Sequence, residues 1–365
     1  MNQPVIDPLP VGQFLAMEIE GHGWTQADFA GVVGRPVQFV SEIVNGKKEI
    51  TRESAAQISA ALGHSPQFWL NFQDAFLLAR QAESTSTQRD LSDVRRRARL
   101  NRLVPLSILR KRGVLHGTDL DDLETQVKDL LELPRIDAEP SFSIAARRSD
   151  KDQPISLVQR AWVGCVRKQA REHGHDLGDF STKKAAMLAA ELPGLLTTPS
   201  QFSDLPVIFA AAGIVLVYVE ALPSAKIDGC AFMLENRPVV AISGRGKRLD
   251  IILWTLLHEL AHLVLGHLSQ EVLIDALDDH DESDQHSEAH DPEESADKRA
   301  RGWLLPEPLP QAPARIGTDW VDAVARQRGL APIVVVGQLQ KRGALDWRTT
   351  LARNAPTVSD RLAAW

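Results

Sequence analysis

Short amphipathic runs separated by turn residues fill the first 81 residues of the chain. Apolar positions recur at the three- and four-residue spacing of helices in five segments between residues 10 and 81. Thr25, Thr51 and Ser65 stand at N-cap positions, where a side-chain oxygen accepts a hydrogen bond from a free backbone N–H. Pro36 and Pro66 fall in first helical turns, where a missing N–H costs nothing. Four glycines end the preceding segments: Gly23, Gly34, Gly46 and Gly63. The region is therefore predicted to be a compact five-helix module.

The hydrophobic period changes in the second half of the chain. After Gly213, the runs GIVLVYVE, CAFMLE and PVVAIS are short and β-branched or apolar, and they predict a small sheet. Residues 248–267, RLDIILWTLLHELAHLVLGH, return to helical spacing without a breaker. Residues 268–297 lack lysine and arginine and are predicted to form an acidic loop, with helices after it to the end of the chain. We expect a mostly α fold with a small β-sheet, of the α+β class.

The composition is that of an ordinary globular protein. A length of 365 residues predicts two or three domains. A hydrophobic share of 44% excludes a fully disordered or collagen-like chain. Because no apolar run reaches the ~20 residues of a membrane helix, and the start lacks the pattern of a secretory signal, we expect a soluble, cytoplasmic protein with no membrane partner. Cys165 and Cys230 have no CxxC partner and are expected to be reduced packing residues.

Charge is distributed unevenly along the chain. The net charge of −7 argues against non-specific nucleic-acid binding. Residues 89–112 nevertheless hold nine Lys or Arg against two acids. A solvated connecting helix is the favoured interpretation of this basic cluster, and added contact with DNA phosphates is the alternative. Residues 113–200 read as further helices in which no chemistry is evident, so we expect a packing or spacer role there.

Residues 258–262 form the motif His-Glu-Leu-Ala-His within the predicted helix 248–267. Residues four apart lie on the same helix face, so the imidazoles of His258 and His262 can point at one metal ion, while Glu259 can reach a metal-bound water as general base. Bound zinc lowers the pKa of water toward ~7 and polarises a carbonyl. The motif therefore predicts zinc peptidase chemistry. A bound but non-catalytic metal, or two polar surface histidines, are the alternatives.

Tetrahedral zinc with one open position needs a third protein ligand. Leu265 and Leu268 stand where the metzincin pattern requires Gly and His, which excludes that class. His267 follows His262 by five residues and is turned about 140° away on an ideal helix, so it is disfavoured as a ligand.

The better candidate for the third ligand lies near the end of this acidic stretch, where the next helix begins. Glu293 can bind the metal, while Asp297, one turn later, hydrogen-bonds a ligand histidine. Glu294 is the alternative ligand. The remaining histidines of the acidic loop are expected to be solvated: His280, His286 and His290.

The sequence around the motif resembles the ImmA/IrrE family of metallo-endopeptidases. The similarity covers about residues 205–345 and rests on LLHELAHLVLGH, on EESADKRARGWLLP after the acidic insert, and on DGCAFMLENRPVVAISGRGKRLD before it. The chain departs from the family at Ser295, which replaces an acid, and at Arg299, which replaces an aromatic residue. The resemblance implies a gluzincin-like zinc site and limited proteolysis of a partner repressor, or in some members sensing without cleavage.

Residues 25–48 have a helix-turn-helix pattern. The second helix begins at about Arg35-Pro36 and turns Val40, Ile43 and Val44 inward. Glutamine and asparagine on its outer edge suit adenine, while the nearby cations suit phosphates or guanine. The predicted DNA-contacting residues are Gln26, Arg35, Gln38, Ser41, Asn45, Lys47 and Lys48.

Residues 1–82 carry five Lys or Arg against eight acids, so we expect weak non-specific affinity for DNA and reliance on dimerisation. A helical bundle used for protein contacts is the alternative. Residues 23–73 resemble the Xre/Cro-type domain of HigA-like antitoxins, which implies operator binding, usually as a dimer. A second helix-turn-helix-like stretch, WVDAVARQRGLAPIVVVGQLQKRG, lacks a polar base-reading edge and is expected to pack against the rest of the chain.

Together these patterns predict a regulator of four regions. Residues 1–82 form a DNA-binding helix-turn-helix domain, 83–204 a helical linker, 205–310 a zinc metallopeptidase-like domain and 311–365 a C-terminal helical extension. Two hypotheses remain open. In the first, the chain binds a double-stranded operator and cleaves a repressor or antitoxin with the help of zinc. In the second, it is a non-cleaving antitoxin or transcription factor that senses a ligand, a metal or a cognate toxin.

Overall fold

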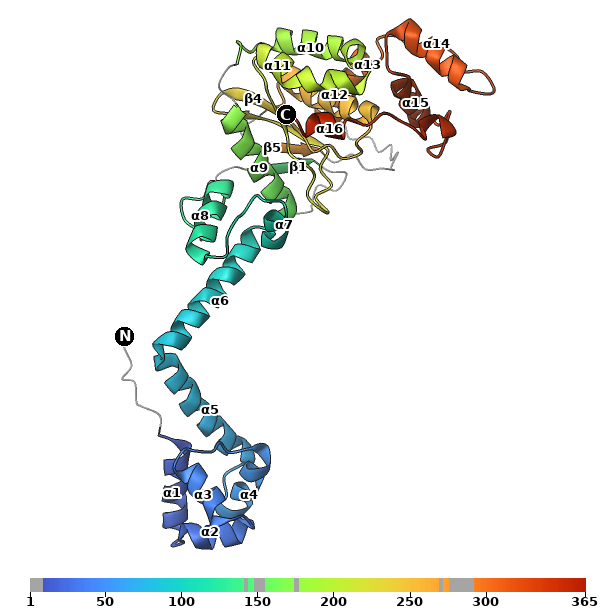
Figure 1. Cartoon of the computed structure of the whole chain (residues 1–365). Coiled ribbons are helices and arrows are strands. Elements are labelled where there is room, and N and C mark those ends of the chain that lie inside the picture. Colours follow the sequence, from blue (N-terminus) through green and yellow to red (C-terminus); the bar gives the residue numbers. More distant parts are fainter. Residues whose placement is uncertain (1–8, 141–143, 148–154, 174–176, 269–271, 276–291) are drawn as a thin grey trace. The chain divides into compact units, whose positions relative to one another are not determined.

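Two compact units make up the chain, Met1–Arg97 and Ala98–Trp365. The computed structural model (Figure 1) describes residues 9–140, 144–147, 155–173, 177–268, 272–275 and 292–365. Helices predominate and one small sheet lies in the second unit, which confirms the predicted mostly helical fold. Among the described residues, no helix is both long enough and apolar enough to span a membrane.

Helices α1 to α5 build the N-terminal unit in the predicted order. Thr25, Thr51 and Ser65 cap α2, α4 and α5 as expected, each accepting a hydrogen bond from the backbone N–H three residues later. Pro66 opens α5 as predicted, but Pro36 is the N-cap of α3 and not part of its first turn, because its ψ of 145° is extended. The helices are α1 Val11–Gly21, α2 Gln26–Val33, α3 Val37–Val44, α4 Arg52–Leu62 and α5 Pro66–Glu83.

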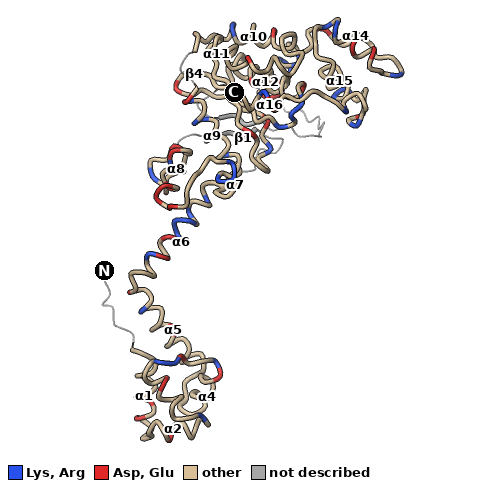
Figure 2. The backbone as a smooth tube through the Cα atoms, viewed as in Figure 1, with Lys and Arg blue, Asp and Glu red and all other residues tan. Residues whose placement is uncertain are grey.

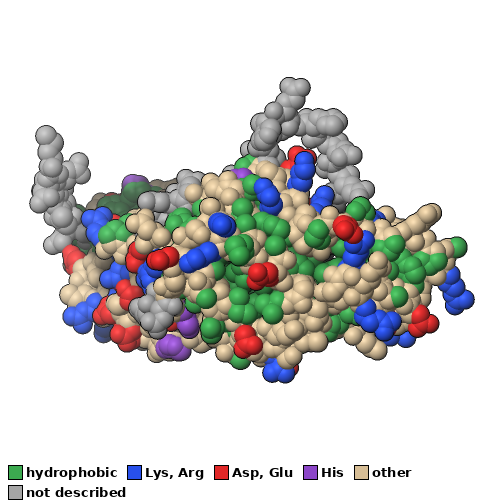
Figure 3. All heavy atoms as spheres, turned by 90° about the horizontal axis from the view of Figure 1, so that it is seen from above, with side chains coloured by type: hydrophobic (Ala, Val, Ile, Leu, Met, Phe, Trp, Pro, Cys, Tyr) green, Lys and Arg blue, Asp and Glu red, His purple; other side chains and the backbone are tan. Residues whose placement is uncertain are grey.

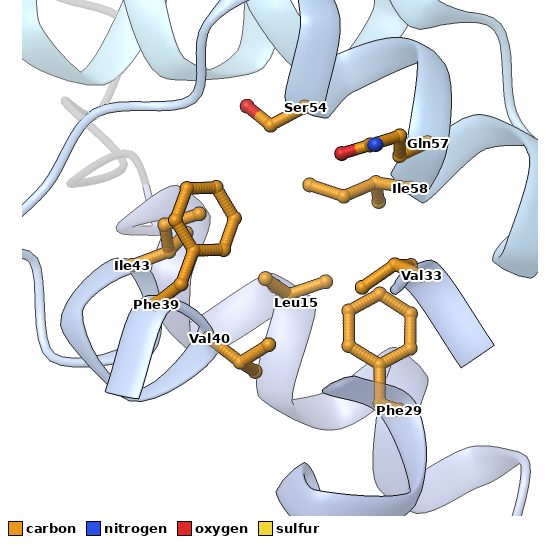
Figure 4. A pocket seen from close by; sticks show the side chains of 9 residues that line it. All are labelled: Leu15, Phe29, Val33, Phe39, Val40, Ile43, Ser54, Gln57 and Ile58. Carbon is orange, nitrogen blue, oxygen red and sulfur yellow. The ribbon is translucent and has the colours of Figure 1, made fainter. Parts of the chain in front are cut away.

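Leu15 of α1 lies at the centre of the apolar core of this unit (Figure 4). The side chains around it come from three other helices: Phe29, Val33, Phe39, Val40, Ile43 and Ile58. Gly12 lets α1 approach α3 closely, because a Cβ atom at this position would lie 2.3 Å from the carbonyl oxygen of Ile43. Helix α3 is therefore fixed in position by its neighbours, with one edge left outside the core.

Helix α6, Thr85–Leu103, carries much of the basic cluster recognised in the sequence, and Figure 2 shows Lys and Arg along it. Leu100, near its end, is fully buried in the core of the second unit. Several of its arginine residues are exposed: Arg95, Arg97, Arg99 and Arg102. This exposure agrees with a solvated helix, and contact with DNA phosphates stays a prediction.

A five-stranded sheet lies at the centre of the second unit, with strand order β1-β5-β3-β4-β2. Strands β3 and β4 are antiparallel and joined by a two-residue turn at Glu235 and Asn236, whose φ angles are 50° and 65°. The sheet is mixed, because β2 pairs with β4 and β1 with β5 in parallel. The strands are β1 Ile144–Arg147, β2 Val215–Tyr218, β3 Gly229–Leu234, β4 Arg237–Ile242 and β5 Val272–Asp275.

The sheet separates two apolar cores, because successive side chains of a strand point to opposite faces. Leu216 and Val240 enter a core formed with α10 to α15, while Val217 and Phe232 enter a core formed with α8 and α9. The helices and 3-10 turns of this unit are α7 Leu106–Lys111, α8 Leu120–Leu131, α9 Leu157–His173, α10 Thr182–Leu195, η1 Pro199–Asp204, α11 Leu205–Ala211, α12 Leu249–Leu265, α13 Pro292–Leu304, α14 Thr318–Arg328, α15 Pro332–Lys341, η2 Thr350–Ala352 and α16 Ser359–Leu362.

Residues 98–204, expected as most of a helical linker, lie in the same compact unit as the sheet. The apolar faces of α8 and α9 cover one side of the sheet, and Glu132 after α8 binds Arg167 of α9 at 2.6 Å. This segment also supplies β1, whose partner β5 lies within the predicted acidic loop over 268–297. The segment is therefore part of the fold itself. Residues 269–271 and 276–291 of that loop lie outside the described residues.

The C-terminal helices α14 and α15 pack into the core that contains α12, as the sequence predicts for the second helix-turn-helix-like stretch. Val324 and Val335 are almost completely buried there. Figure 3 shows hydrophobic side chains interspersed with charged ones on one face of the molecule. Met187 of α10 and Val207 of α11 are among the exposed apolar residues of this unit. Cys165 and Cys230 are both buried, as expected for packing residues.

Candidate metal centre and nucleic-acid interface

Helix α12 carries the His-Glu-Leu-Ala-His motif and is buried along most of its length. Its apolar residues pack between the sheet and α10 and α13, and it ends at Gly266, whose φ is 71°. Within this apolar setting, His258, Glu259 and His262 are only 5%, 0% and 0% exposed. Buried ionisable side chains are costly unless they are paired or coordinate a metal, so this turn of the helix requires a specific arrangement.

Two imidazole nitrogens and one carboxylate oxygen converge between α12 and α13. Nε2 of His258 lies 3.0 Å from Nε2 of His262. Oε2 of Glu293 lies 3.2 Å from Nε2 of His258 and 3.5 Å from Nε2 of His262. The three atoms therefore surround one point, and each offers a lone pair that a cation can use.

The chemistry of this donor set fits a metal ion. When the protons of the two neutral imidazoles are on Nδ1, both Nε2 atoms and the carboxylate oxygen are acceptors that face one another without a donor. Two histidines and one glutamate are an established ligand set for zinc with one open position. Burial raises the pKa of Glu293, but the neighbouring imidazoles of His258 and His262 lower it by more, so the carboxyl is ionised at neutral pH.

Each of the two histidines also contacts a polar side chain through its other ring nitrogen, Nδ1. Nδ1 of His258 lies 2.9 Å from Oδ1 of Asp297, whose other oxygen accepts a hydrogen bond from Arg301 at 3.1 Å. Burial raises the pKa of Asp297, but the hydrogen bond from His258 and the nearby positive charges lower it by more. Nδ1 of His262 lies 3.1 Å from Nδ1 of His267. Such contacts fix the orientation of the imidazole rings and so aim their Nε2 atoms.

His267 therefore lies beside the site, although on an ideal helix it points away. The reason is that α12 stops at Leu265, and the left-handed Gly266 turns the chain back toward His262. The glycine directly after the periodic apolar run was the sequence signal that the helical-wheel argument overlooked.

Glu259 lies against the backbone of β3 with no exposed surface. A Cβ atom at Gly229 would lie 2.4 Å from Oε1 of Glu259 and 2.8 Å from Cγ2 of Thr255. The missing side chain of Gly229 therefore makes room for the carboxylate. Nothing in the sequence pointed to Gly229, because its role depends on how the strand packs against the helix.

The alternative ligand Glu294 is not brought into the site. Glu294 is exposed, although it is the neighbour of Glu293. Ser295 donates a hydrogen bond to the carbonyl of Pro292 at 3.4 Å, and the guanidinium of Arg299 lies over the ring of Trp303. Three histidines fall outside the described residues: His280, His286 and His290.

Helices α2 and α3 form the helix-turn-helix of the N-terminal unit. Gly34, with φ of 65°, ends α2 in the left-handed conformation and allows the sharp turn into α3. Val40 and Ile43 are 1% exposed and face the core as expected, whereas Val44 is only half-buried. The opposite edge of α3 is therefore available for a partner.

This edge carries the polar residues that the sequence analysis singled out. Gln38 and Asn45 are exposed and Ser41 is half-buried, while Gln26 is half-buried at the first position of α2. Nε2 of Gln38 donates to Oε1 of Glu42 at 3.0 Å, and Nδ2 of Asn45 donates to the carbonyl of Ser41 at 2.8 Å. These local hydrogen bonds hold the amides along the helix.

The cations near α3 differ in what they contact. Arg35 forms an ion pair with Glu53 of α4, and its Nε donates to Gln57 at 2.9 Å. Lys47 is exposed and forms no ion pair with a described residue. Nζ of Lys48 lies 4.8 Å from the ring centroid of Phe39.

Glu42 is a functional candidate that the sequence analysis missed. It lies between Gln38 and Lys48 on the same edge, with Lys48 at 3.8 Å. A carboxylate side chain is able to accept hydrogen bonds from cytosine N4, and its charge repels phosphate. Glu42 follows Gln38 by four residues, and this spacing already places the two side chains on the same face of the predicted helix.

Comparison with known proteins places the helix-turn-helix in a family. The Helix-turn-helix family model matches residues 15–69. Antitoxin HigA-1 of Vibrio cholerae is 39% identical over 69 residues, which are 19% of this chain and 65% of that protein. The uncharacterized HTH-type transcriptional regulator YddM of Escherichia coli is also 39% identical over 69 residues, 19% of this chain and 69% of that protein.

A solved structure of an addiction module antidote protein of a HigA family from Coxiella burnetii is 27% identical, with a TM-score of 0.22, and the match covers 23% of this chain and 91% of that one. The chain spans slightly less than two thirds of HigA-1 and slightly more than two thirds of YddM. On the strength of residues 15–69, the chain belongs to the helix-turn-helix family.

Proposed function

We propose that the chain is a DNA-binding transcriptional regulator whose second unit contains a zinc-dependent endopeptidase that acts on a repressor or antitoxin protein. The observation that carries the enzymatic part is the convergence of His258 Nε2, His262 Nε2 and Glu293 Oε2 within 3.5 Å of one another. The resemblance of residues 205–345 to ImmA/IrrE endopeptidases supports the reaction class, with residues 205–310 as the catalytic domain.

In this proposal each side chain has a defined task. His258, His262 and Glu293 hold the zinc, and Asp297 orients His258 through its Nδ1–H. Zinc bound there supplies a Lewis acid that polarises a peptide carbonyl and lowers the pKa of water. Glu259 is the general base, which accepts a proton on its carboxylate and passes it to the leaving amine.

The DNA-binding part rests on α3, which enters the major groove. Gln38, Ser41 and Asn45 read base edges, and the exposed Lys47 and Lys48 contact phosphates. The remaining predicted contacts are Gln26 and Arg35. The similarity of residues in this unit to HigA-1, an antitoxin by name, supports a cognate toxin as a further partner. A homodimer on a double-stranded operator is what the resemblance of residues 23–73 to Xre/Cro-type domains implies.

A second candidate function is a non-cleaving antitoxin or transcription factor that senses a metal, a ligand or a toxin through the same unit. The complete burial of Glu259 favours it, because a general base must come within hydrogen-bond reach of its proton. In that case the metal centre stabilises the fold without hydrolysis.

Proteolysis by the zinc-loaded full chain distinguishes these functions. The purified chain is incubated alone and with candidate repressors and antitoxins, and new N-termini are identified by mass spectrometry. Endopeptidase function predicts new termini that are absent in a Glu259→Gln variant with normal zinc content and absent after chelation. Cleavage that persists in Glu259→Gln refutes the assigned mechanism, and a complete lack of new termini favours the sensor.

Operator binding is tested with DNA selected from a random pool by the full chain. Gln38→Ala is expected to cost about 1–3 kcal/mol on the selected sequence and little on random DNA. Lys47→Ala is expected to weaken binding to both DNA sequences alike and to reduce the salt dependence by about one phosphate contact. Equal losses for both variants on both DNA sequences contradict base reading by α3.

A further inference from the structure

A cavity of about 530 Å³ lies next to the candidate metal centre within the second unit. Its walls come from the segment before α12, from α12 itself and from α15. Trp254 forms part of the wall one turn before His258, and the centroids of the two rings are 6.5 Å apart. The volume is in the range of cavities that hold small organic molecules, roughly 300–1,000 Å³.

Most charges at this cavity neutralise one another in pairs. Arg248 donates two hydrogen bonds to Asp250, at 3.0 and 2.6 Å, and Arg245 lies 3.2 Å from Asp228. Gly337 lets the Arg248–Asp250 pair lie close to α15, because a Cβ atom at this glycine would lie 2.5 Å from Oδ2 of Asp250. The two arginine–aspartate pairs therefore form a fixed polar wall with no net charge.

Lys341 is the exception at this cavity. Its Nζ lies 3.9 Å from the ring centroid of Trp254, which holds the ammonium through a cation–π contact. Among the described residues it has no hydrogen-bond acceptor and no ion pair within 4 Å. Asp297 and Asp250 attract the ammonium without accepting a hydrogen bond from it, so its three N–H donors remain available. The cavity lining holds three cations and two carboxylates, so its net charge is positive.

Two further features of the lining indicate which other groups a ligand needs. Trp254 is 4% exposed, and its indole N–H has no acceptor among the residues that the structure describes. Apolar side chains of Ile251, Leu304 and Val334 also face the cavity. An occupant therefore needs an acceptor group with negative charge and an apolar body.

We propose that this cavity binds a small organic carboxylate, with its anionic group on Lys341 and its apolar part against Ile251, Leu304 and Val334. A single free ammonium balances the one charge of a carboxylate, whereas a doubly charged phosphate leaves one negative charge unbalanced. A carboxylate can come from a free acid or from an acidic side chain of a peptide. The proposal does not depend on peptidase activity, because none of these residues is a metal ligand.

Calorimetric titration of the full chain with matched probes tests this proposal. The probes are 4-phenylbutyrate and the neutral 4-phenylbutyramide, and the metal is first removed by chelation so that no carboxylate binds at the metal centre. We expect the acid to bind at least about tenfold more tightly than the amide, because hydrogen bonds to a charged group are the stronger ones. Lys341→Met removes this preference, and Lys341→Arg retains it. Arg342→Met, the neighbouring exposed cation, is the control and leaves the preference intact.

A second pair of probes separates the two sources of the carboxylate. Acetyl-Ala-Glu-Ala amide is compared with acetyl-Ala-Gln-Ala amide in the same titration. A Lys341-dependent preference for the acid within either pair supports the site, and the pair that shows it names the source. Equal affinity for acid and neutral probe in both pairs, a preference that survives in Lys341→Met, or no binding up to about 10 mM overturns the proposal.

Discussion

The substitution of Glu293 by glutamine is the most specific perturbation of the metal centre. Glu293→Gln keeps the size of the side chain but removes its negative charge and replaces one of the two oxygens by an NH₂ group. Oε2 of Glu293 is one of three donors that meet within 3.5 Å, so its loss removes a third of the protein ligands. Losing only the partner behind a ligand costs about 10–100-fold in metal affinity. We therefore expect Glu293→Gln to cost at least about 100-fold, or roughly 2.7 kcal/mol.

Zinc affinity is measured by competition with a chromophoric chelator at constant pH. Glu294→Gln is the matched control, because it removes the same charge from the adjacent exposed residue and should leave the zinc affinity unchanged. Asp297→Asn, which replaces the carboxylate behind His258, is expected to cause an intermediate loss of about 10–100-fold. Thermal unfolding of the three metal-free variants shows whether a loss of affinity is instead a loss of fold.

The relative sizes of these three losses in zinc affinity test the assignment of Glu293 as the third ligand. If Glu293→Gln binds zinc as tightly as the unchanged chain, or if Glu294→Gln loses as much, the third ligand is wrongly assigned. In that case the convergence of the three atoms does not describe how the protein holds a metal.

Three further substitutions test the packing and the electrostatics. Gly12→Ala places a Cβ 2.3 Å from a backbone carbonyl of α3 and should destabilise the N-terminal unit by about 1–3 kcal/mol in urea unfolding. Gly31→Ala is the control, because a Cβ there has no atom within 4 Å and should not destabilise the unit. Equal effects of the two substitutions contradict this account. Burial raises the pKa of Glu132, but hydrogen bonds from two arginines of α9 lower it by more. Its folded-state pKa thus lies below the unfolded value of ~4.3, so its contribution is present above that pH and disappears as the pH falls through the folded value. Glu132→Gln should therefore cost about 2–3 kcal/mol at pH 7 and progressively less below pH ~4, and a constant difference in unfolding free energy across this range excludes the ion pair as its cause. Gly229→Ala should displace the Glu259 carboxylate and lower the unfolding temperature while zinc affinity stays within about threefold, since no metal ligand moves; loss of zinc instead contradicts the separation of these roles.

The sequence was informative wherever a feature depends on residues close together in the chain. The caps at Thr25, Thr51 and Ser65 and the helix around His258 follow from local rules of hydrogen bonding and periodicity. Strands β2, β3 and β4 were predicted for the same reason. The spacing of four between the two histidines places both on one helix face regardless of the rest of the fold.

Features that depend on distant contacts were harder to predict. Strands β1 and β5 are four residues long and pair across more than a hundred residues, so neither has a clear pattern of its own. The apolar faces of α8 and α9 were visible in the sequence, but their partner, the sheet, was not, and a spacer role was the resulting interpretation. His267 was misplaced because an ideal helix was extended through Gly266.

X-ray absorption at the zinc edge of the full chain tests the central claim most directly. The account predicts one zinc per chain with two imidazole nitrogens at about 2.0–2.1 Å, oxygen as the remaining ligand type, and an altered spectrum in Glu293→Gln. Sulfur at about 2.3 Å, a spectrum without imidazole scattering, or one unchanged in Glu293→Gln would contradict it.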